Sequence, residues 1–195
     1  VWQSLPEQLA KENKKFVATQ AQSGARLKDF ESAIQWLVAS GLVHQIFRIT
    51  KPNLPLGGYQ DNVFKLYFVD VGLLTAKTGL DVSVLLAGNR LFTEFKGALT
   101  EQYVLQQLLV SGLEPIFYWG LERAVAEVDF VVQHSSQIIP IEVKAEENLK
   151  AKSLRSYYDK FKPDKVFRTS MSDYRKQDWL VNLPLYALAN FRSLE

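Results

Sequence analysis

The fold is decided by Ala126-Glu-Val-Asp-Phe-Val-Val132 and Ile138-Ile-Pro-Ile-Glu-Val-Lys144. In both stretches apolar residues predominate and alternate with charged ones over part of the length, at 126–130 and at 141–144, which is typical of a half-buried β-strand. The segment between them, His134-Ser-Ser-Gln137, is short and polar and predicts a tight turn. We therefore expect the two strands to be neighbours in a sheet.

The charged residues of these strands are expected on one patch of that sheet. Because side chains alternate along a strand, Glu127 and Asp129 should share one face of the first strand. By the same rule Glu142 and Lys144 should share one face of the second. Pairing through the tight turn would bring Asp129 beside Glu142 and Lys144, so that two carboxylates and an ammonium group converge.

Such a patch has the chemistry of a metal-dependent hydrolase. Carboxylates, water and phosphate oxygens are the ligands that Mg²⁺ prefers, and Asp129 and Glu142 are the candidate ligands of one or two Mg²⁺ or Mn²⁺ ions. A bound ion can polarise a phosphodiester and lower the pKa of a water molecule. Lys144 could stabilise the developing charge. Glu101, near the edge of the apolar stripe of a preceding helix, could lean toward the same patch as a third carboxylate.

A plain structural interpretation stays open beside the catalytic one. Acid–lysine pairs are common on the solvated face of antiparallel hairpins and contribute a few tenths of a kcal/mol. A Glu-x-Lys triplet alone occurs in many strands by chance. The spacing Asp-x12-Glu-x-Lys on two consecutive apolar strands, after a long helix and before another, is more specific.

Composition restricts the chemistry further. The chain has 195 residues, 23 Lys and Arg against 21 Asp and Glu, two His and no Cys. The absence of Cys excludes disulfides, thiolate zinc sites, iron–sulfur clusters and cysteine nucleophiles. With only His44 and His134, a His-rich metal site or a Ser-His-Asp triad is nearly excluded. Carboxylates and lysines must carry any chemistry.

Several targeting and cofactor signals are missing from the sequence. The first residues lack the charged and apolar regions of a signal peptide, and no apolar run approaches the length of a transmembrane helix. We therefore expect a cytoplasmic protein without a membrane partner. No G-x-x-x-x-G-K-[ST] motif occurs, so we expect no ATP binding through a P-loop in this chain.

Two modules are expected, with a boundary near residue 90. The first, residues 1–90, has the order of a winged helix, in which helices precede a two-stranded hairpin. Its expected helices cover 4–23, 27–40 and 70–77, and its strands 42–49 and 64–69.

The second module, residues 91–195, is expected to have the element order αβββαβ with additions, which makes the whole chain an α/β (α+β) protein. Its long helix ends at Ser111-Gly112, and a last helix follows Pro184. The other elements are expected as strands at 116–119, 126–132, 138–144, 165–169 and 179–181, and a basic helix at about 150–161.

Basic residues are concentrated in one part of the chain. Residues 150–168 contain seven Lys and Arg against two Asp. Lys150, Lys152 and Arg155 are candidate contacts to a phosphate backbone. In the first module, Arg48 and Lys51 lie around the expected wing and are further candidates. A solvated helix face is at least as good an interpretation of the 150–168 cluster.

The pattern Asp129…Glu142-Val-Lys144 resembles the PD-(D/E)xK restriction-endonuclease-like superfamily. Three further motifs resemble the C-terminal region, a domain of unknown function, of a prokaryotic family of AAA-type ATPases. They are Leu5-Pro-Glu-Gln-Leu-Ala-Lys-Glu-Asn-Lys-Lys-Phe16, Phe64-Lys-Leu-Tyr-Phe-Val-Asp-Val-Gly-Leu-Leu74 and Gly97-Ala-Leu-Thr-Glu-Gln-Tyr-Val104.

This resemblance implies a chain whose ATPase module precedes it in cis and holds the ATP site. The Gly-x-Leu-x-Glu helix motif of the family falls on Gly97, Leu99 and Glu101. The nuclease carboxylates fall on Asp129 and Glu142, and the lysine on Lys144. One departure is Val128, where many superfamily members have Pro before the aspartate.

Three functions are therefore open. The leading hypothesis is a nucleic-acid-processing region with Mg²⁺- or Mn²⁺-dependent phosphodiester hydrolysis. The second is a non-catalytic module that binds DNA or a protein and positions the ATPase. The third is a structural domain that forms a homo-oligomer. A resemblance in fold does not establish activity.

Overall fold

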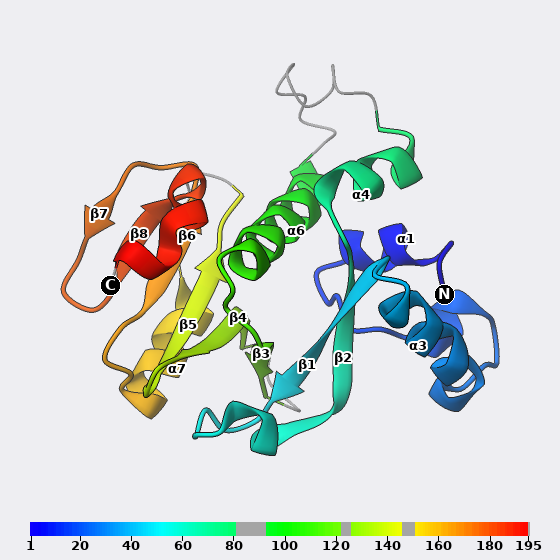
Figure 1. The fold of residues 1–195 in the computed structure, drawn as a ribbon, viewed down its shortest axis with the longest axis horizontal. Coiled ribbons are helices and arrows are strands. Elements are labelled where there is room, and N and C mark those ends of the chain that lie inside the picture. Colours follow the sequence, from blue (N-terminus) through cyan, green and yellow to red (C-terminus); the bar gives the residue numbers. More distant parts are fainter. Residues whose placement is uncertain (81–92, 122–125, 146–150, 195) are drawn as a thin grey trace. The chain divides into compact units, whose positions relative to one another are not determined.

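The computed structural model describes residues 1–80, 93–121, 126–145 and 151–194 as a mixed α/β protein (Figure 1). This confirms the α/β class expected from the sequence. Within the described residues, eight strands form one mixed sheet in the order β2-β1-β3-β4-β5-β6-β8-β7. None of the helices in those residues combines the length and the apolar character needed to cross a bilayer.

The chain folds into two compact units. The first comprises Val1–Ile46 and Val63–Tyr103, and the second comprises Phe47–Asn62 and Val104–Glu195. Each unit is therefore built from two separate stretches of chain. The boundary expected near residue 90 lies outside the described residues.

The elements up to residue 110 mostly follow the sequence expectation. The helices are α1 (Leu5–Ala10), α2 (Ala18–Ala21), the 3₁₀ helix η1 (Leu27–Phe30), α3 (Glu31–Ala39), α4 (Val71–Thr78) and α6 (Thr93–Val110). The strands are β1 (Val43–Ile49) and β2 (Gln60–Phe68), with the 3₁₀ helix η2 (Leu56–Tyr59) before β2. The second unit contains the end of β1, the whole of η2, the start of β2 and the end of α6, and the rest belongs to the first unit.

The continuous helix expected over residues 4–23 is wrong. Helix α1 ends at Ala10, and Lys11 is already extended. Lys15 then forms a β-bridge with Lys65 of β2, and Phe16 stacks on Phe64 with ring centroids 5.7 Å apart. Strand pairing and aromatic burial outweigh helix propensity in this polar segment, because propensity is only a weak preference.

The second unit contains the remaining strands and one covering helix. The elements are β3 (Ile116–Gly120), β4 (Glu127–His134), β5 (Gln137–Val143), α7 (Lys152–Phe161), β6 (Phe167–Ser170), β7 (Arg175–Lys176), β8 (Val181–Pro184) and the 3₁₀ helix η4 (Leu185–Leu194). They confirm the expected order, with β7 as an added strand and the last helix as 3₁₀. Strands β5, β6 and β8 run parallel to one another, whereas β3, β4 and β5 are antiparallel neighbours.

A β-bulge interrupts β4 at Asp129 and Phe130. Phe117 of β3 pairs with Val131, but Trp119 pairs with Val128, so Asp129 and Phe130 together face one residue of β3. Val128 and Val131 consequently join the same core cluster although they are three residues apart. The strict alternation expected for 126–132 is therefore wrong beyond Asp129, because the bulge inserts one extra residue.

Helix α7 packs on β4 and β5 (Figure 1), and an aromatic cluster joins it to Trp119 of β3. Tyr157 meets the Trp119 ring edge-to-face, with centroids 5.2 Å apart, and Phe161 lies 4.9 Å from Tyr157. The Tyr157 hydroxyl is buried and has no hydrogen-bond partner within the described part of the chain. Its burial raises the pKa of Tyr157, so the hydroxyl stays protonated.

Substituting Tyr157→Phe should leave the free energy of unfolding unchanged or raise it by up to about 1 kcal/mol. The change removes a buried polar atom that gains no bond, while the ring keeps its packing. Urea unfolding followed by circular dichroism measures the effect, with Tyr174→Phe as the exposed control. A loss above about 1 kcal/mol would show that the hydroxyl makes a stabilising bond.

Candidate functional site

The predicted hairpin of β4 and β5 is present and ends at the candidate carboxylates. Its register runs from His134↔Gln137 at the turn to Phe130↔Ile141. Ser135 in the turn has a φ of 54°, a left-handed conformation that suits a two-residue connection. The residues that follow the last pair of the ladder are Asp129 on β4 and Glu142 on β5.

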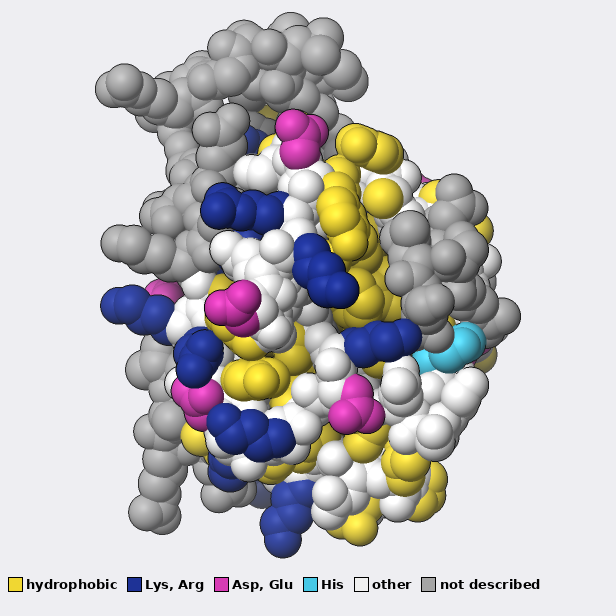
Figure 2. All heavy atoms as spheres, turned by 90° about the vertical axis from the view of Figure 1, so that its left-hand side faces the viewer, with side chains coloured by type: hydrophobic (Ala, Val, Ile, Leu, Met, Phe, Trp, Pro, Cys, Tyr) yellow, Lys and Arg dark blue, Asp and Glu magenta, His cyan; other side chains and the backbone are white. Residues whose placement is uncertain are grey.

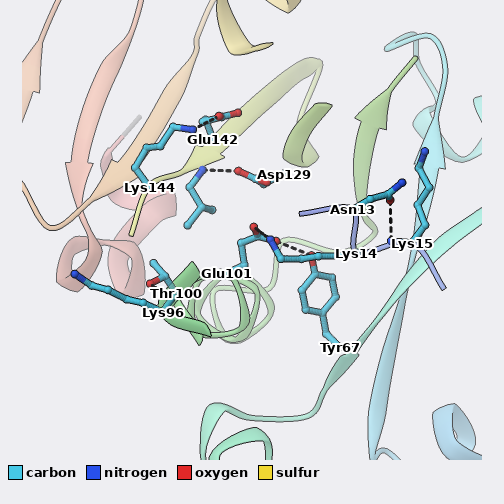
Figure 3. Close-up of polar contacts among 11 residues, drawn as sticks. Asn13, Lys14, Lys15, Tyr67, Lys96, Thr100, Glu101, Asp129, Glu142 and Lys144 are labelled. Carbon is cyan, nitrogen blue, oxygen red and sulfur yellow. Dashed lines mark hydrogen bonds and ion pairs between the residues drawn. The ribbon is translucent and has the colours of Figure 1, made fainter. Parts of the chain in front are cut away.

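Asp129 is bound directly to the Glu-x-Lys segment. The backbone N–H of Val143 donates to its Oδ2 over 2.7 Å (Figure 3). Since Val143 stands between Glu142 and Lys144, this bond fixes the aspartate beside both. The bond lies beside the bulge: Asp129 is one of the two bulged residues opposite β3, and the ladder with β5 ends at the next residue, Phe130.

Glu142 and Lys144 form an ion pair at the end of β5. The Nζ atom of Lys144 lies 2.7 Å from Oε1 of Glu142 (Figure 3). The side chain of Glu142 is 7% exposed and that of Lys144 is 29% exposed. The backbone N–H of Lys144 donates to the carbonyl oxygen of Thr169 over 2.9 Å, which anchors this end of β5 to β6. The structure thus brings together three of the four candidate catalytic residues.

Arg168 is a charged neighbour that the sequence indicated only as a member of the basic cluster at 150–168. It pairs with Glu142 across the β5–β6 ladder and with Asn182 across β6–β8, and it is only 2% exposed. Its Nε donates to Oδ1 of Asn182 over 2.9 Å. Burial lowers the pKa of Arg168, the positive charge of Arg175 lowers it further, and the negative charge of Glu142 raises it.

The sequence signal for Arg168 is its place in the expected strand at 165–169, directly after the apolar Val166 and Phe167. The structure buries every residue of Val166-Phe-Arg-Thr-Ser170. A cation inside a buried strand requires a partner of opposite charge or a hydrogen-bond acceptor. Glu142 and Asn182 supply these, so Arg168 belongs to the candidate site.

The donor set of the site fits a divalent ion of the magnesium type. Mg²⁺ is usually bound by one or two carboxylates, with water and substrate phosphate completing its octahedron. Asp129 and Glu142 supply two carboxylates, and no group of three or more His, Cys, Asp or Glu that could hold an ion occurs in the described ranges. The positive charges of Lys144 and Arg168 balance the two carboxylates.

Glu101 lies in the first unit, where it has its own partners. It is buried on α6, and Lys14 forms an ion pair with it while the Tyr67 hydroxyl donates to it over 3.0 Å (Figure 3). Lys65, 1% exposed, contributes a second positive charge. Burial opposes ionisation, but Lys14 and Lys65 together with these hydrogen bonds hold the pKa of Glu101 below its ordinary value of 4.5.

The candidate phosphate contacts have different surroundings. Arg155 is half-exposed and forms an ion pair with Asp159, with Nε and Oδ2 3.0 Å apart. Lys152, the first residue of α7, and Lys51, after β1, are both exposed. Lys150 lies outside the described residues.

Arg48 differs from these residues because it is buried. It is 4% exposed, and its Nη2 and Nε atoms lie 2.6 and 2.8 Å from Oδ2 of Asp61. A phosphate could contact this guanidinium only if the ion pair opened.

The models of two families match separate parts of the chain. The family model of a domain of unknown function, DUF4143, matches residues 96–188, and that of another domain of unknown function, DUF8612, matches residues 1–83. All four candidate catalytic residues lie within the DUF4143 match.

Comparison with individual proteins returns one solved structure. The crystal structure of protein VC1899 from Vibrio cholerae has a TM-score of 0.31 and 12% sequence identity. The match covers 99% of this chain and 52% of that chain, so this chain spans about half the length of that protein. No curated protein sequence matches the chain.

Substituting Glu101→Gln should lower the free energy of unfolding by about 3 kcal/mol at pH 7, because it leaves buried lysines without their counter-charge. The folded pKa of Glu101 lies below 4.5, so its stabilising effect is full above that pH and is lost as the pH falls through the folded value. The difference between wild type and variant should therefore shrink on acidification.

Urea titrations between pH 7 and pH 3 measure this difference. Glu12→Gln, which changes an exposed carboxylate of the same unit, is the matched control and should have no such pH-dependent effect. A Glu101→Gln penalty that is constant over the whole pH range would contradict the charge-based account.

Proposed function

We propose that the second unit is a metal-dependent phosphodiesterase that acts on nucleic acid. The observation that carries this proposal is the hydrogen bond from the Val143 N–H to Asp129, which joins the aspartate to Glu142-Val-Lys144. If Asp129 only decorated a solvated hairpin face, its carboxylate would need no hydrogen bond to the backbone of the neighbouring strand. The bulge that contains Asp129 also supports the proposal, because bulges occur often beside active sites.

The arrangement of elements supports a restriction-endonuclease-like domain. The order α6-β3-β4-β5-α7-β6 is αβββαβ, and the candidate residues come from β4 and from the end of β5. The order α3-β1-β2 supports a winged-helix-like module before it. The motifs quoted above support an origin of the chain in the AAA-type ATPase family, with DNA as substrate and an ATPase module in cis.

In this function each residue of the site has a defined task. Asp129 and Glu142 hold Mg²⁺ or Mn²⁺, which when bound polarises the phosphodiester and lowers the pKa of water. Lys144 moves its ammonium group from Glu142 to the phosphoryl oxygen, where it stabilises the charge that develops. Arg168 keeps Glu142 in place from the neighbouring strand. Glu101 remains a further candidate from the sequence motif.

Substituting Asp129→Asn or Lys144→Met should lower the rate of cleavage at least 100-fold, because each removes a charge that the reaction needs. In Asp129→Asn the new side chain still offers an amide oxygen to the Val143 N–H, so folding should survive. The assay incubates plasmid DNA, single-stranded DNA and RNA with Mg²⁺ or Mn²⁺ and resolves the products on gels. Glu114→Gln, which changes an exposed carboxylate of the same unit, serves as the control.

Equal rates in wild type, Asp129→Asn and Lys144→Met would overturn the catalytic proposal. Comparing Asp129→Asn with Asp129→Ala separates chemistry from stability, because only alanine also removes the hydrogen-bond acceptor. Both should be inactive, whereas only the alanine variant should unfold at lower urea concentration.

One observation favours the alternative of a non-catalytic binding module. Both carboxylates already have partners within the chain, Asp129 in the Val143 N–H and Glu142 in Lys144. An ion would have to compete with the Lys144 ammonium group. In this alternative, calorimetry should detect no binding of Mg²⁺ or Mn²⁺, while the protein still binds DNA in a salt-sensitive way.

A further inference from the structure

A second candidate site lies elsewhere in the second unit. A cavity of about 510 Å³ opens between the connection from α7 to β6 and the hairpin of β7 and β8. This volume is within the range of small-molecule sites. Four of its lining residues carry aromatic rings: Tyr158, Phe167, Tyr174 and Trp179. Phe167 is buried, whereas the other three are at least partly exposed. None of the candidate catalytic residues lines it.

Two of these rings are held in place. Tyr158 and Trp179 have centroids 5.4 Å apart at an angle of 48°. The guanidinium carbon of Arg155 lies 5.1 Å from the Trp179 centroid and 5.5 Å from the Tyr158 centroid. Trp179 is carried by a turn that a hydrogen bond from Gln177 N–H to the Leu180 carbonyl oxygen closes over 2.9 Å. The aromatic wall is thus preorganised.

The cavity is lined by charges of both signs. Lys165 and Lys176 line it together with Asp164 and Asp178. Figure 2, which faces the side of the molecule that carries β7, shows Lys and Arg side chains, with Asp and Glu among them, around exposed hydrophobic ones. The cavity therefore offers both cations and hydrogen-bond acceptors beside its aromatic rings.

We propose that this cavity binds a nucleotide. Rings that line a cavity favour a flat ligand, the two lysines can bind a phosphate, and the two aspartates can accept hydrogen bonds from amino groups. A nucleotide combines a flat base that carries amino groups with a phosphate, so it fits all three features. The base stacks against the rings of Tyr158, Tyr174 and Trp179. Lys165 and Lys176 contact the phosphate, while Asp178 accepts from an amino group on the edge of the base.

This site is independent of the proposed hydrolysis. Binding needs no divalent ion and none of the residues at the ends of β4 and β5. The nucleotide can be free in solution or part of a single strand, since both present an unstacked base and a phosphate. A duplex cannot supply it, because its bases are paired and stacked inside the helix.

The experiment measures binding in EDTA, so that cleavage cannot interfere. Fluorescence anisotropy follows fluorescein-labelled single strands of DNA and RNA, about 15 nucleotides long to span one site, and a duplex of the same sequence. Unlabelled mononucleotides compete in a second series. We expect the single strands to bind more tightly than the duplex. Competition by mononucleotides would identify the free nucleotide as a ligand, whereas its absence would identify the strand.

Variants of the lining residues test whether the single strand binds in the cavity. Tyr174→Ala and Trp179→Ala should each weaken binding of the single strand about tenfold, which is the order of magnitude for one stacked base. Lys176→Gln should weaken it and reduce its dependence on salt. Tyr174 is 60% exposed, so its replacement should not disturb folding even if that of Trp179 does.

Two controls keep the inference separate from the proposed function. Tyr186→Ala removes a tyrosine of the same unit that is 76% exposed and does not line the cavity, and it should bind as wild type does. Asp129→Asn should also bind normally, even if it abolishes cleavage. Absence of binding to every probe, or equal affinity in wild type, Tyr174→Ala and Lys176→Gln, would overturn the proposal.

Discussion

The candidate site depends on one extra residue in β4. Without the bulge, strict alternation would hold along the strand, and Val128 and Val131 would lie on opposite faces of the sheet. With it, Val128 and Val131 both enter the core, and the Asp129 carboxylate binds the backbone N–H of Val143. The bulge disturbs the pairing of β4 with β3, which costs free energy. The hydrogen bond from the Val143 N–H to the Asp129 carboxylate offsets part of that cost, because a bond to a charged acceptor is stronger than one between neutral groups.

Buried charges in both units are balanced locally. In the second unit Glu142 has Lys144 beside it and Arg168 on the adjacent strand, and Arg168 is in turn bound to Asn182. In the first unit Glu101 is balanced by Lys14 and Lys65. Burial of an isolated charge is costly, so such clusters constrain which side chains can be replaced. In the second unit Lys144 already pairs with Glu142, so its ammonium group would compete with a metal ion for that carboxylate.

The elements of the second unit were largely predictable, because each hydrophobic stretch has a clear period and ends at turn residues such as Ser111-Gly112. The convergence of Asp129 with Glu142 and Lys144 was predictable from the tight turn. The bulge was not, since nothing in the alternation of 126–132 marks an extra residue. The break after Ala10 was also missed, because contacts of Phe16 with a distant strand decide it.

The sequence by itself determined which chemistry is available: with no Cys and two His, only carboxylates and lysines remain, and their spacing identifies the strand ends that carry them. The tertiary structure alone decided the environment of each group. It buried Arg48 and Arg168 with partners, and it assembled the aromatic cavity from segments on α7 and on the β7–β8 hairpin. The physical reason is that burial and pairing depend on neighbours distant in sequence, which local periodicity does not encode.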